Sequence, residues 1–139
     1  MILTKENYID GIEYQAIDLF KQLSNRNQIS LKDLIFNNAY NNYIISCHIL
    51  NDKLLGMASM CLYKTISGHK GWIEDVVVDA SMRGMGIGSK LISELLEESK
   101  RLNLTDVLLF TEPEKEFAIS LYNKLGFKKR DSIIMIKKY

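Results

Sequence analysis

Apolar residues along this chain alternate between helical spacing and continuous runs. The first apolar stripe recurs at i, i+4, i+8 and i+11, the spacing of one helix face, and consists of Tyr8, Ile12, Ala16, Leu19, Phe20 and Leu23. A second helix is predicted after Ser30, because Asp33 follows three positions later, as in a capping box. Its apolar positions are Leu31, Leu34, Ile35 and Ala39. The pattern therefore predicts two N-terminal helices, after a short strand at residues 2–3.

Three apolar runs then predict strands. Residues 43–50 (YIISCHIL) and 54–63 (LLGMASMCLY) are expected to pair as antiparallel strands around a turn at residues 51–53. Residues 64–70 (KTISGHK) are predicted to be a loop that leads into a central strand, residues 72–78 (WIEDVVV).

A glycine-rich segment, residues 83–88 (RGMGIG), connects the central strand to a third amphipathic helix. The core stripe of this helix is predicted to be Ile87, Leu91, Ile92, Leu95 and Leu96. Its solvent-facing residues are predicted to be Glu94, Glu97, Glu98 and Lys100. Residues 106–111 (DVLLFT) then predict a short strand covered on both faces.

A last helix is predicted to begin between Thr111 and Glu114, which have capping-box spacing, with Pro113 in the first turn. Gly126 is predicted to end it. Its stripe consists of Phe117, Ala118, Leu121, Tyr122 and Leu125. Residues 127–139 are predicted to form two strands around residues 129–131. The element order indicates an α+β fold with a single mixed, mostly antiparallel central sheet flanked by helices on both faces.

The composition fits one globular domain spanning residues 1–139, with 47% hydrophobic and 25% charged residues. A net charge of +1 gives no electrostatic reason to expect a nucleic acid or a membrane as partner. The chain has no apolar run near the roughly 20 residues of a membrane helix and no signal-peptide pattern, so a cytoplasmic location is expected. Cys47 and Cys61 fall in strand patterns and predict reduced thiols. No metal is expected, because His48 and His69 lack partners at ligand spacing.

The glycines at 84, 86 and 88 carry the main chemical signal. They stand where a helix begins, and the first N–H groups of a helix lack intrahelical acceptors and lie at its positive end. Glycine allows positive φ angles and close approach of a ligand to the backbone. A phosphate group suits such a site, with Arg83 and Lys90 adding positive charge. The alternative is that the glycines serve only a tight turn.

The spacing of these glycines excludes two common phosphate loops. The dinucleotide fingerprint needs a third glycine where Ser89 stands, and a Walker A loop needs lysine directly after its last glycine. The remaining pattern resembles the R/Q-x-x-G-x-G/A acyl-CoA loop of the Gcn5-related N-acetyltransferase (GNAT) superfamily. Residues 118–127 (AISLYNKLGF) are similar to the segment that closes these domains. The resemblance covers about residues 43–139, and the first 42 residues only by helix order.

This resemblance implies transfer of an acetyl group from acetyl-CoA to a primary amine by direct attack. The residues that it implies in cofactor binding are Val76, Val77, Val78, Arg83, Gly84, Met85, Gly86, Ile87, Gly88, Ser89, Lys90, Lys115 and Tyr122. Lys115 departs from the family pattern, which often has asparagine there, and it is expected either to reach a CoA phosphate or to be solvated. Family members often dimerise through the sheet edge or the last strands, so a homodimer is also implied.

Three residues are candidates for proton transfer. Glu74 is the first candidate for general base, because period two puts it on one face with Trp72, Val76 and Val78, where apolar neighbours raise a carboxyl pKa. Asp75 on the opposite face is the second, and water is the alternative to both. A β-bulge near Val77 would aim groups into the site. Tyr122 is the candidate general acid toward the departing thiolate, against the alternative of a core tyrosine.

The acceptor is the least defined part of the sequence-based prediction. Residues 69–91 and the LYNKLGF ending look most like the glucosamine-6-phosphate N-acetyltransferase branch of the family. Amino acids, polyamines, antibiotics and protein amines remain open as acceptors. Two other functions also remain open: a non-catalytic acyl-CoA-binding sensor, which needs the loop but not Tyr122, and a plain interaction domain, which needs neither.

Overall fold

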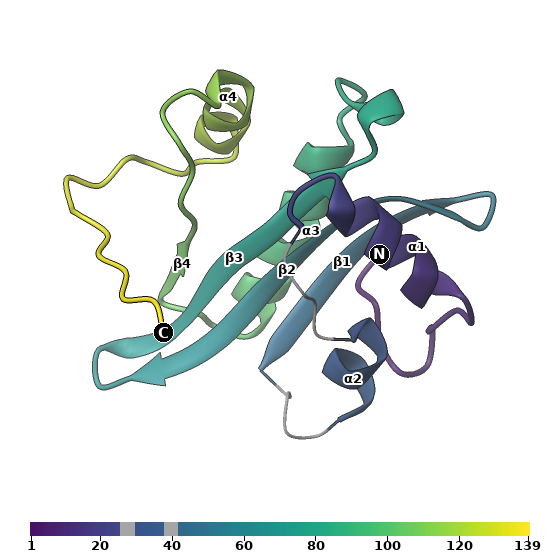
Figure 1. Cartoon of the computed structure of the whole chain (residues 1–139). Coiled ribbons are helices and arrows are strands. Elements are labelled where there is room, and N and C mark those ends of the chain that lie inside the picture. The colour runs from purple at the N-terminus through teal and green to yellow at the C-terminus, as the bar shows by residue number, and fades with distance from the viewer. Residues whose placement is uncertain (26–29, 38–41) are drawn as a thin grey trace.

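Four strands form one mixed sheet in the order β1-β2-β3-β4 in the computed structural model, which describes residues 1–25, 30–37 and 42–139 (Figure 1). The strands β1 (Tyr43–Leu50), β2 (Lys53–Thr65) and β3 (Gly68–Val78) pair antiparallel, and β4 (Asp106–Leu108) pairs parallel to β3. Helices α1 (Ile12–Lys21) and α2 (Leu31–Phe36) pack on one face, and α3 (Ile87–Arg101) packs on the other. This arrangement confirms the predicted α+β class.

Both antiparallel connections are tight hairpins. Asn51 and Asp52, between β1 and β2, have φ angles of 49° and 59°, the left-handed geometry that matches the twist of paired strands. The predicted loop at residues 64–70 is wrong, since β2 and β3 extend through it and leave only Ile66 and Ser67 between them. Backbone pairing at this exposed end needs no apolar side chains, so the hydrophobic pattern did not reveal it.

The core has one cluster on each face of the sheet. The cluster under α1 and α2 contains Leu3, Ile12, Ala16, Leu19, Leu31, Ile45, Cys47, Leu54, Met57 and Val77. The cluster under α3 contains Leu55, Ala58, Met60, Ile73, Ile87, Leu91, Ile92 and Leu95. The predicted stripe of α3 is therefore confirmed, with Leu96 half-buried. Among the residues described, no helix is long and apolar enough to cross a membrane.

Glu94 of α3 does not face water as predicted. Its carboxylate accepts a 2.6 Å hydrogen bond from the hydroxyl of Ser46, a fully buried residue of β1, and a 2.6 Å bond from the Met1 amine. A hydroxyl buried under the helix needs an acceptor, and Glu94 supplies it. Its partner lies 48 residues away, so the helix pattern alone could not indicate this contact.

The N-terminal helices are shorter than predicted. Helix α1 begins at Ile12 rather than Tyr8, and Gly11 is its N-cap. The cap of α2 is confirmed, because the Ser30 hydroxyl accepts the Asp33 N–H at 3.2 Å. Ala39 lies outside the described residues. Residue Ile2 forms an isolated bridge to β1 rather than a strand.

The C-terminal part differs most from the prediction. Strand β4 is only three residues long and half-exposed, and α4 (Glu116–Lys124) begins at Glu116, so the predicted capping box at Thr111 does not form. Phe117 is 96% exposed rather than part of the core stripe. Gly126 ends α4 as predicted, since its φ is 90° and its N–H donates to the Asn123 carbonyl at 3.1 Å.

The two strands predicted for residues 127–139 are absent, and residues 128–139 are exposed throughout. A strand needs a neighbouring backbone to pair with, and in this single chain residues 128–139 join no strand of the sheet. Figure 1 shows this segment in yellow, running from α4 down the left-hand side of the view to the C-terminus, which lies near the lower end of β4 in that view.

Candidate functional site

A β-bulge interrupts β3 at Asp75 and Val76. The register moves from Ser59 opposite Glu74 to Met57 opposite Val77, so Asp75 and Val76 together face Ala58. Asp75 has a φ of 53°, a left-handed conformation that is uncommon for a residue other than glycine. The bulge expected near Val77 is confirmed.

The bulge changes which side chains share a face. Ile73, Val76 and Val78 contact the core under α3, whereas Val77 belongs to the core under α1. Strict alternation from Ile73 then puts Glu74 on the α1 face. The predicted grouping of Glu74 with Val76 and Val78 is therefore wrong, because the extra residue of the bulge reverses the alternation.

Two carboxyl groups lie next to each other at the bulge. Both Glu74 and Asp75 are exposed as residues, yet partial burial of their carboxyl groups raises the pKa of each. The negative charge of Asp75 raises the pKa of Glu74 further. The Trp72 indole lies near the Glu74 carboxyl and favours its charged form, although the buried indole N–H meets no acceptor at hydrogen-bond geometry within the described structure.

Ser59 on β2 supports this part of the strand. Its hydroxyl donates to the main-chain oxygen of Glu74 at 3.1 Å, and its hydrogen bonding also lowers the pKa of Asp75 against the larger effect of burial. Ser59 itself is buried, with 6% of its surface exposed. Sequence reasoning missed this residue, because its partners are 15 or more positions away and only the strand register brings them together.

β4 pairs along its whole length, but only with the N-terminal part of β3. The paired residues are Lys70 with Asp106, Gly71 with Val107, and Trp72 with Leu108. Beyond this point β4 ends, and residues 73–78 of β3 have no strand on that side within the sheet described. Because no strand pairs with it there, the main chain next to the bulge can accept an extended, amide-bearing ligand as an additional strand.

The glycine segment (residues 83–88) follows the end of β3 after four residues of the chain. Gly84 and Gly86 have φ angles of 80° and 79°, and a Cβ built at either residue would meet no atom within 4 Å. Gly86 is the N-cap of α3 and offers no side chain to the free N–H groups of the first turn. At Gly88 a Cβ would lie 3.5 Å from Leu121 of α4, so this glycine sits in the packing between helices.

Neighbouring side chains fix the approach to the glycines. The Nε of Arg83 donates to the Val78 carbonyl at 3.3 Å, which holds the start of the segment against the end of β3. Asp79 caps the short 3₁₀ helix η2 (Ala80–Met82) through the Ser81 N–H at 3.0 Å. Gln22, just after α1, accepts the Ala80 N–H at 3.0 Å. This last contact was not predicted, because Gln22 and Ala80 are 58 positions apart.

Two of the remaining predicted residues, Tyr122 and Lys115, lie on α4 or just before it. Tyr122 is half-buried against the core under α3, the cluster that Val76 and Val78 also pack against, and burial raises the pKa of its phenol. Its ring contacts the ring of Phe127 edge to face, with centroids 6.0 Å apart. Lys115 is the N-cap of α4, and its Nζ lies 3.0 Å from the Glu112 carboxylate. Met85 and Lys90 are exposed, and Ser89 is half-buried.

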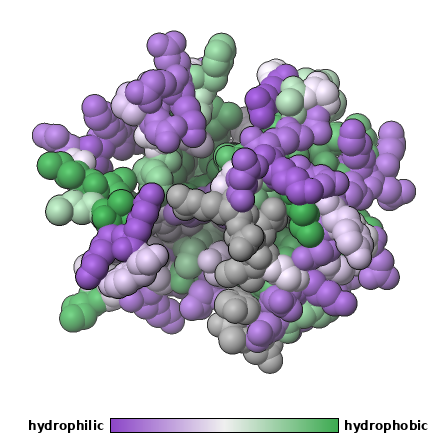
Figure 2. All heavy atoms as spheres, viewed as in Figure 1, coloured by the Kyte–Doolittle hydropathy of each residue, from purple (hydrophilic) through white to green (hydrophobic). Residues whose placement is uncertain are grey.

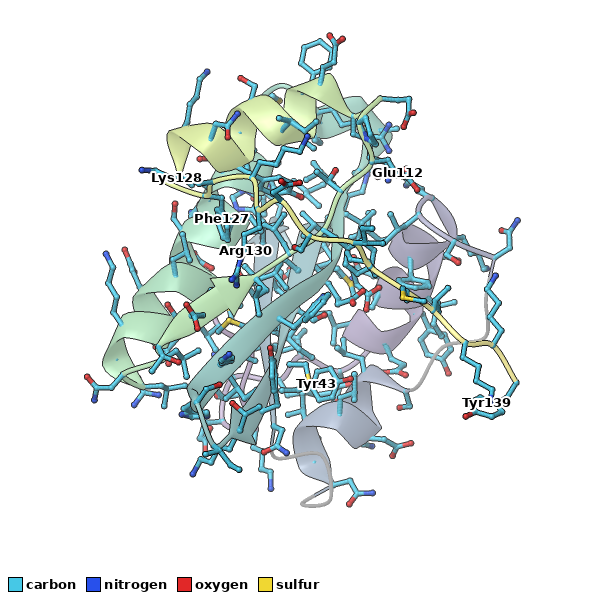
Figure 3. All side chains as sticks on the ribbon, turned by 90° about the vertical axis from the view of Figure 1, so that its left-hand side faces the viewer. Tyr43, Glu112, Phe127, Lys128, Arg130 and Tyr139 are labelled. Atoms are coloured by element: carbon cyan, nitrogen blue, oxygen red, sulfur yellow. The ribbon has the colours of Figure 1, made fainter. Side chains whose placement is uncertain are left out.

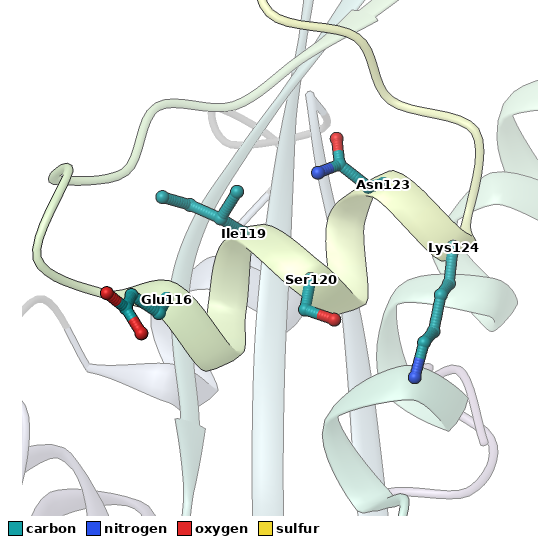
Figure 4. A pocket seen from close by; sticks show the side chains of 5 residues that line it. All are labelled: Glu116, Ile119, Ser120, Asn123 and Lys124. Atoms are coloured by element: carbon teal, nitrogen blue, oxygen red, sulfur yellow. The ribbon is translucent and has the colours of Figure 1, made fainter.

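An open depression of about 510 Å³ lies along α4 (Figure 4). The residues that line it all belong to α4: Glu116, Ile119, Ser120, Asn123 and Lys124. None of the residues predicted for cofactor binding or catalysis lines it, so this depression is not part of the candidate site.

The sequence of this chain matches a family of known proteins. Residues 12–127 match the model of the acetyltransferase (GNAT) family, and the chain belongs to that family. A glucosamine 6-phosphate N-acetyltransferase from Trypanosoma brucei brucei is 38% identical over 87 residues, which cover 60% of this chain and 57% of that protein. The matched part spans about half the length of the first curated relatives, at 57%, 42% and 50%.

Solved structures share the whole fold. An aminoglycoside acetyltransferase from an uncultured soil metagenomic sample, in complex with trehalose, superposes with a TM-score of 0.81 and 18% identity over 100% of this chain and 93% of that chain. A predicted acetyltransferase from Clostridium acetobutylicum, solved with acetyl-CoA, superposes with a TM-score of 0.70 and 19% identity over 99% and 96% of the two chains. At these identities the likeness concerns the fold.

Proposed function

We propose that this chain is an acetyl-CoA-dependent N-acetyltransferase that acts on the primary amine of a small molecule. The observation that carries the proposal is the junction of β3 and α3. There, two left-handed glycines with open space above them precede a helix whose first N–H groups have no side-chain cap. Free amides at the positive end of a helix fit a diphosphate, which is the anionic part of CoA.

The free edge of β3 fits the rest of the same ligand. The main chains of Val76, Val77 and Val78 run from the bulge toward the glycine segment and can pair with the amides of the pantetheine arm. Acetyl-CoA supplies the activated acetyl group when it is bound. Placing the amine and the thioester in line is worth about 7–11 kcal/mol of the barrier, more than one side chain gives.

Glu74 and Asp75 then serve as alternative proton acceptors for the attacking amine. An aliphatic amine is protonated near neutral pH, and a carboxyl group with a raised pKa is better matched to removing that proton. The two groups share the bulge, so a water molecule between the amine and either carboxylate could also relay the proton. Tyr122 packs against the same core cluster as Val76 and Val78, on the α3 side of the sheet, and we assign it the donation of a proton to the departing sulfur.

An amino sugar is the first acceptor to test. This choice rests on the Trypanosoma relative and on a probable glucosamine 6-phosphate N-acetyltransferase from rice, which is 40% identical over 60 residues. The aminoglycoside acetyltransferase with the same fold and an N-alpha-acetyltransferase relative from fission yeast make antibiotics and peptide amino termini the next candidates.

Two measurements test the proposal. Calorimetric titration with acetyl-CoA measures binding, and thiol release measures transfer across a panel of glucosamine 6-phosphate, a polyamine, an aminoglycoside, an amino acid and a peptide. Binding together with amine-dependent thiol release supports the enzyme. Binding without transfer to any amine would favour an acyl-CoA sensor, in which Tyr122 is only a packed core residue. No binding would exclude both functions.

A further inference from the structure

Trp72 carries a buried hydrogen-bond donor that has no acceptor. Its indole Nε1 is buried and meets no acceptor within the part of the chain that the structure describes. Buried polar groups in proteins are nearly always hydrogen-bonded, so a donor left alone needs an explanation. Trp72 stands two residues before Glu74 in β3, next to the proposed site of proton transfer. An acceptor that reaches the indole in one state of the protein would account for it.

β3 brings the Trp72 and Glu74 side chains to one face of the sheet. Side chains two residues apart in a strand share a face, and the bulge begins only after Glu74. Ile73, between them, is buried in the core under α3, so both neighbours point to the α1 side. Burial and the charge of Asp75 raise the pKa of the Glu74 carboxyl, whereas the nearby indole lowers it. Glu74 is exposed, so its side chain has room to rotate toward the indole N–H.

Aromatic packing fixes the position of the indole. Trp72 pairs with Leu108 of β4, and Phe110 stands two residues beyond Leu108. The rings of Trp72 and Phe110 meet edge to face, with centroids 5.7 Å apart. Trp72 is half-buried by its neighbours, whereas Glu74 is exposed. A fixed donor next to a movable carboxylate determines where that carboxylate points.

The α1 side of β3 is open next to these residues. In Figure 1, neither α1 nor α2 crosses the part of β3 that pairs with β4. Figure 2, in the same view, shows the surface hollowed near the middle, with apolar atoms in the hollow and hydrophilic side chains around it. From this side an amine has access to the exposed Glu74 carboxyl.

Other titratable side chains around this pair come from all four strands and from the segment after α4. They are Tyr43, Cys61, Lys70, Asp75, Asp106 and Arg130. Lys70 and Asp106 form an ion pair with 3.7 Å between nitrogen and oxygen. Figure 3, seen from the β4 side, shows Arg130 overlying the strands in that view. The charge of Asp75 raises the pKa of Glu74, so Asp75 is the group against which Glu74 has to be tested.

We propose that Trp72 is a positioning residue for Glu74: its indole N–H donates a hydrogen bond to the ionised carboxylate and directs it toward the acceptor amine. When the carboxylate takes a proton from the ammonium group it loses its charge, and the hydrogen bond from the indole weakens. This inference rests on the proposed function, in which Glu74 accepts that proton.

Tryptophan fluorescence tests the contact without any catalysis. Trp72 is the only tryptophan of the chain, so its emission reports on protonation of an adjacent carboxyl group. Over the pH range in which circular dichroism shows a folded chain, the emission should follow one titration, and Glu74→Gln should abolish it. An emission that does not change with pH, or a transition that survives Glu74→Gln, overturns the proposal.

Asp75→Asn is the matched control for this titration. Asparagine has nearly the same size as aspartate and tolerates the left-handed backbone at the bulge, where φ is 53°. The transition should persist in this variant and move to lower pH, because the charge of Asp75 raises the pKa of Glu74. A transition that disappears with Asp75→Asn and not with Glu74→Gln would assign the indole to Asp75 and overturn the proposal.

Trp72→Phe tests the role of the indole in the reaction, because phenylalanine keeps an aromatic ring beside Phe110 and removes the N–H. The acidic limb of the pH–rate profile should move to higher pH, so that kcat on that limb falls about 3- to 10-fold while KM for acetyl-CoA is unchanged. In a Glu74→Gln background the same substitution should have no further effect. A limb that stays in place, or an effect confined to KM for the amine, overturns the proposal. A fluorescence titration that depends on Glu74 in a chain that acetylates no amine would refute the proposed function and confirm only the contact.

Discussion

Gly86→Ala tests the proposed cofactor loop most directly, because its cost can be separated from its effect on binding. Gly86 has a φ of 79° and open space around a new Cβ, so the alanine causes backbone strain without a steric clash. The left-handed conformation costs an L-residue about 1–2 kcal/mol. For a domain of this size the melting temperature should fall by roughly 3–10 °C if the loop keeps its shape.

A loop that relaxes to avoid this strain turns a peptide group at the start of α3. At least one N–H then points away from the bound diphosphate. A hydrogen bond to a charged group is worth about 1.5–3 kcal/mol, so acetyl-CoA affinity should fall about 10- to 150-fold. Loss of stability through strain and loss of affinity through loop relaxation are alternative responses to one substitution. We expect to observe the two losses in combination.

Gly11→Ala is a matched control. Gly11 is also an N-cap, with a φ of 85° and no atom within 4 Å of a new Cβ, but it precedes α1 rather than the loop. It should lose similar stability and keep its acetyl-CoA affinity. Calorimetric titration and thermal melts on the same preparations measure both quantities. A folded Gly86→Ala variant that keeps both its affinity and its melting temperature, or an equal loss of affinity in Gly11→Ala, would refute the assigned role of the loop.

Three further substitutions test the proton-transfer residues. Glu74→Gln should reduce the rate and remove the acidic limb of the pH–rate profile. The raised pKa of Glu74 means that its charged form is disfavoured in the folded state, so the wild type loses stability as pH rises through that pKa. The variant should therefore melt at a higher temperature than the wild type at pH 7, but not at a pH below the unfolded pKa of Glu. Ser59→Ala should move the acidic limb to higher pH if Asp75 is the base, since the hydroxyl lowers the pKa of Asp75, and a limb that stays in place assigns the base elsewhere. Tyr122→Phe should lower kcat about 100-fold with little change in KM for acetyl-CoA; wild-type kcat per folded molecule would make Tyr122 a core residue.

The sequence predicted those parts of the molecule whose signals are local. The stripe of α3, the Ser30 cap and the glycines before α3 each depend on residues within one or two turns, and the structure has them as expected. The expectation of a bulge was also correct, but its effect on the face of Glu74 was not, because one inserted residue reverses the alternation that follows it.

The failures occurred where the outcome depends on distant partners. The helix pattern predicted that Glu94 faces solvent, but the fold brings the Ser46 hydroxyl of β1 into a hydrogen bond with it. The capping-box spacing at Thr111 predicted a helix start there, but the helix begins at Glu116. The apolar run at residues 133–136 has strand character but no partner strand in the single chain. Spacing rules describe what a segment can form, whereas pairing decides what it does form.

The contact between Gln22 and Ala80 has a consequence for how acetyl-CoA and the acceptor amine would influence each other's binding. Its 3.0 Å hydrogen bond ties the end of α1 to the turn before the glycine segment. A cofactor that orders this turn would also restrain α1, and thermodynamic linkage requires an acceptor that restrains α1 to tighten cofactor binding by the same factor. Gln22→Ala should then reduce the ratio of acetyl-CoA affinities measured with and without acceptor, while a ratio equal to that of the wild type would show that this bond transmits nothing. In that view α1 is a route for cooperativity between substrates as well as a cover for the sheet.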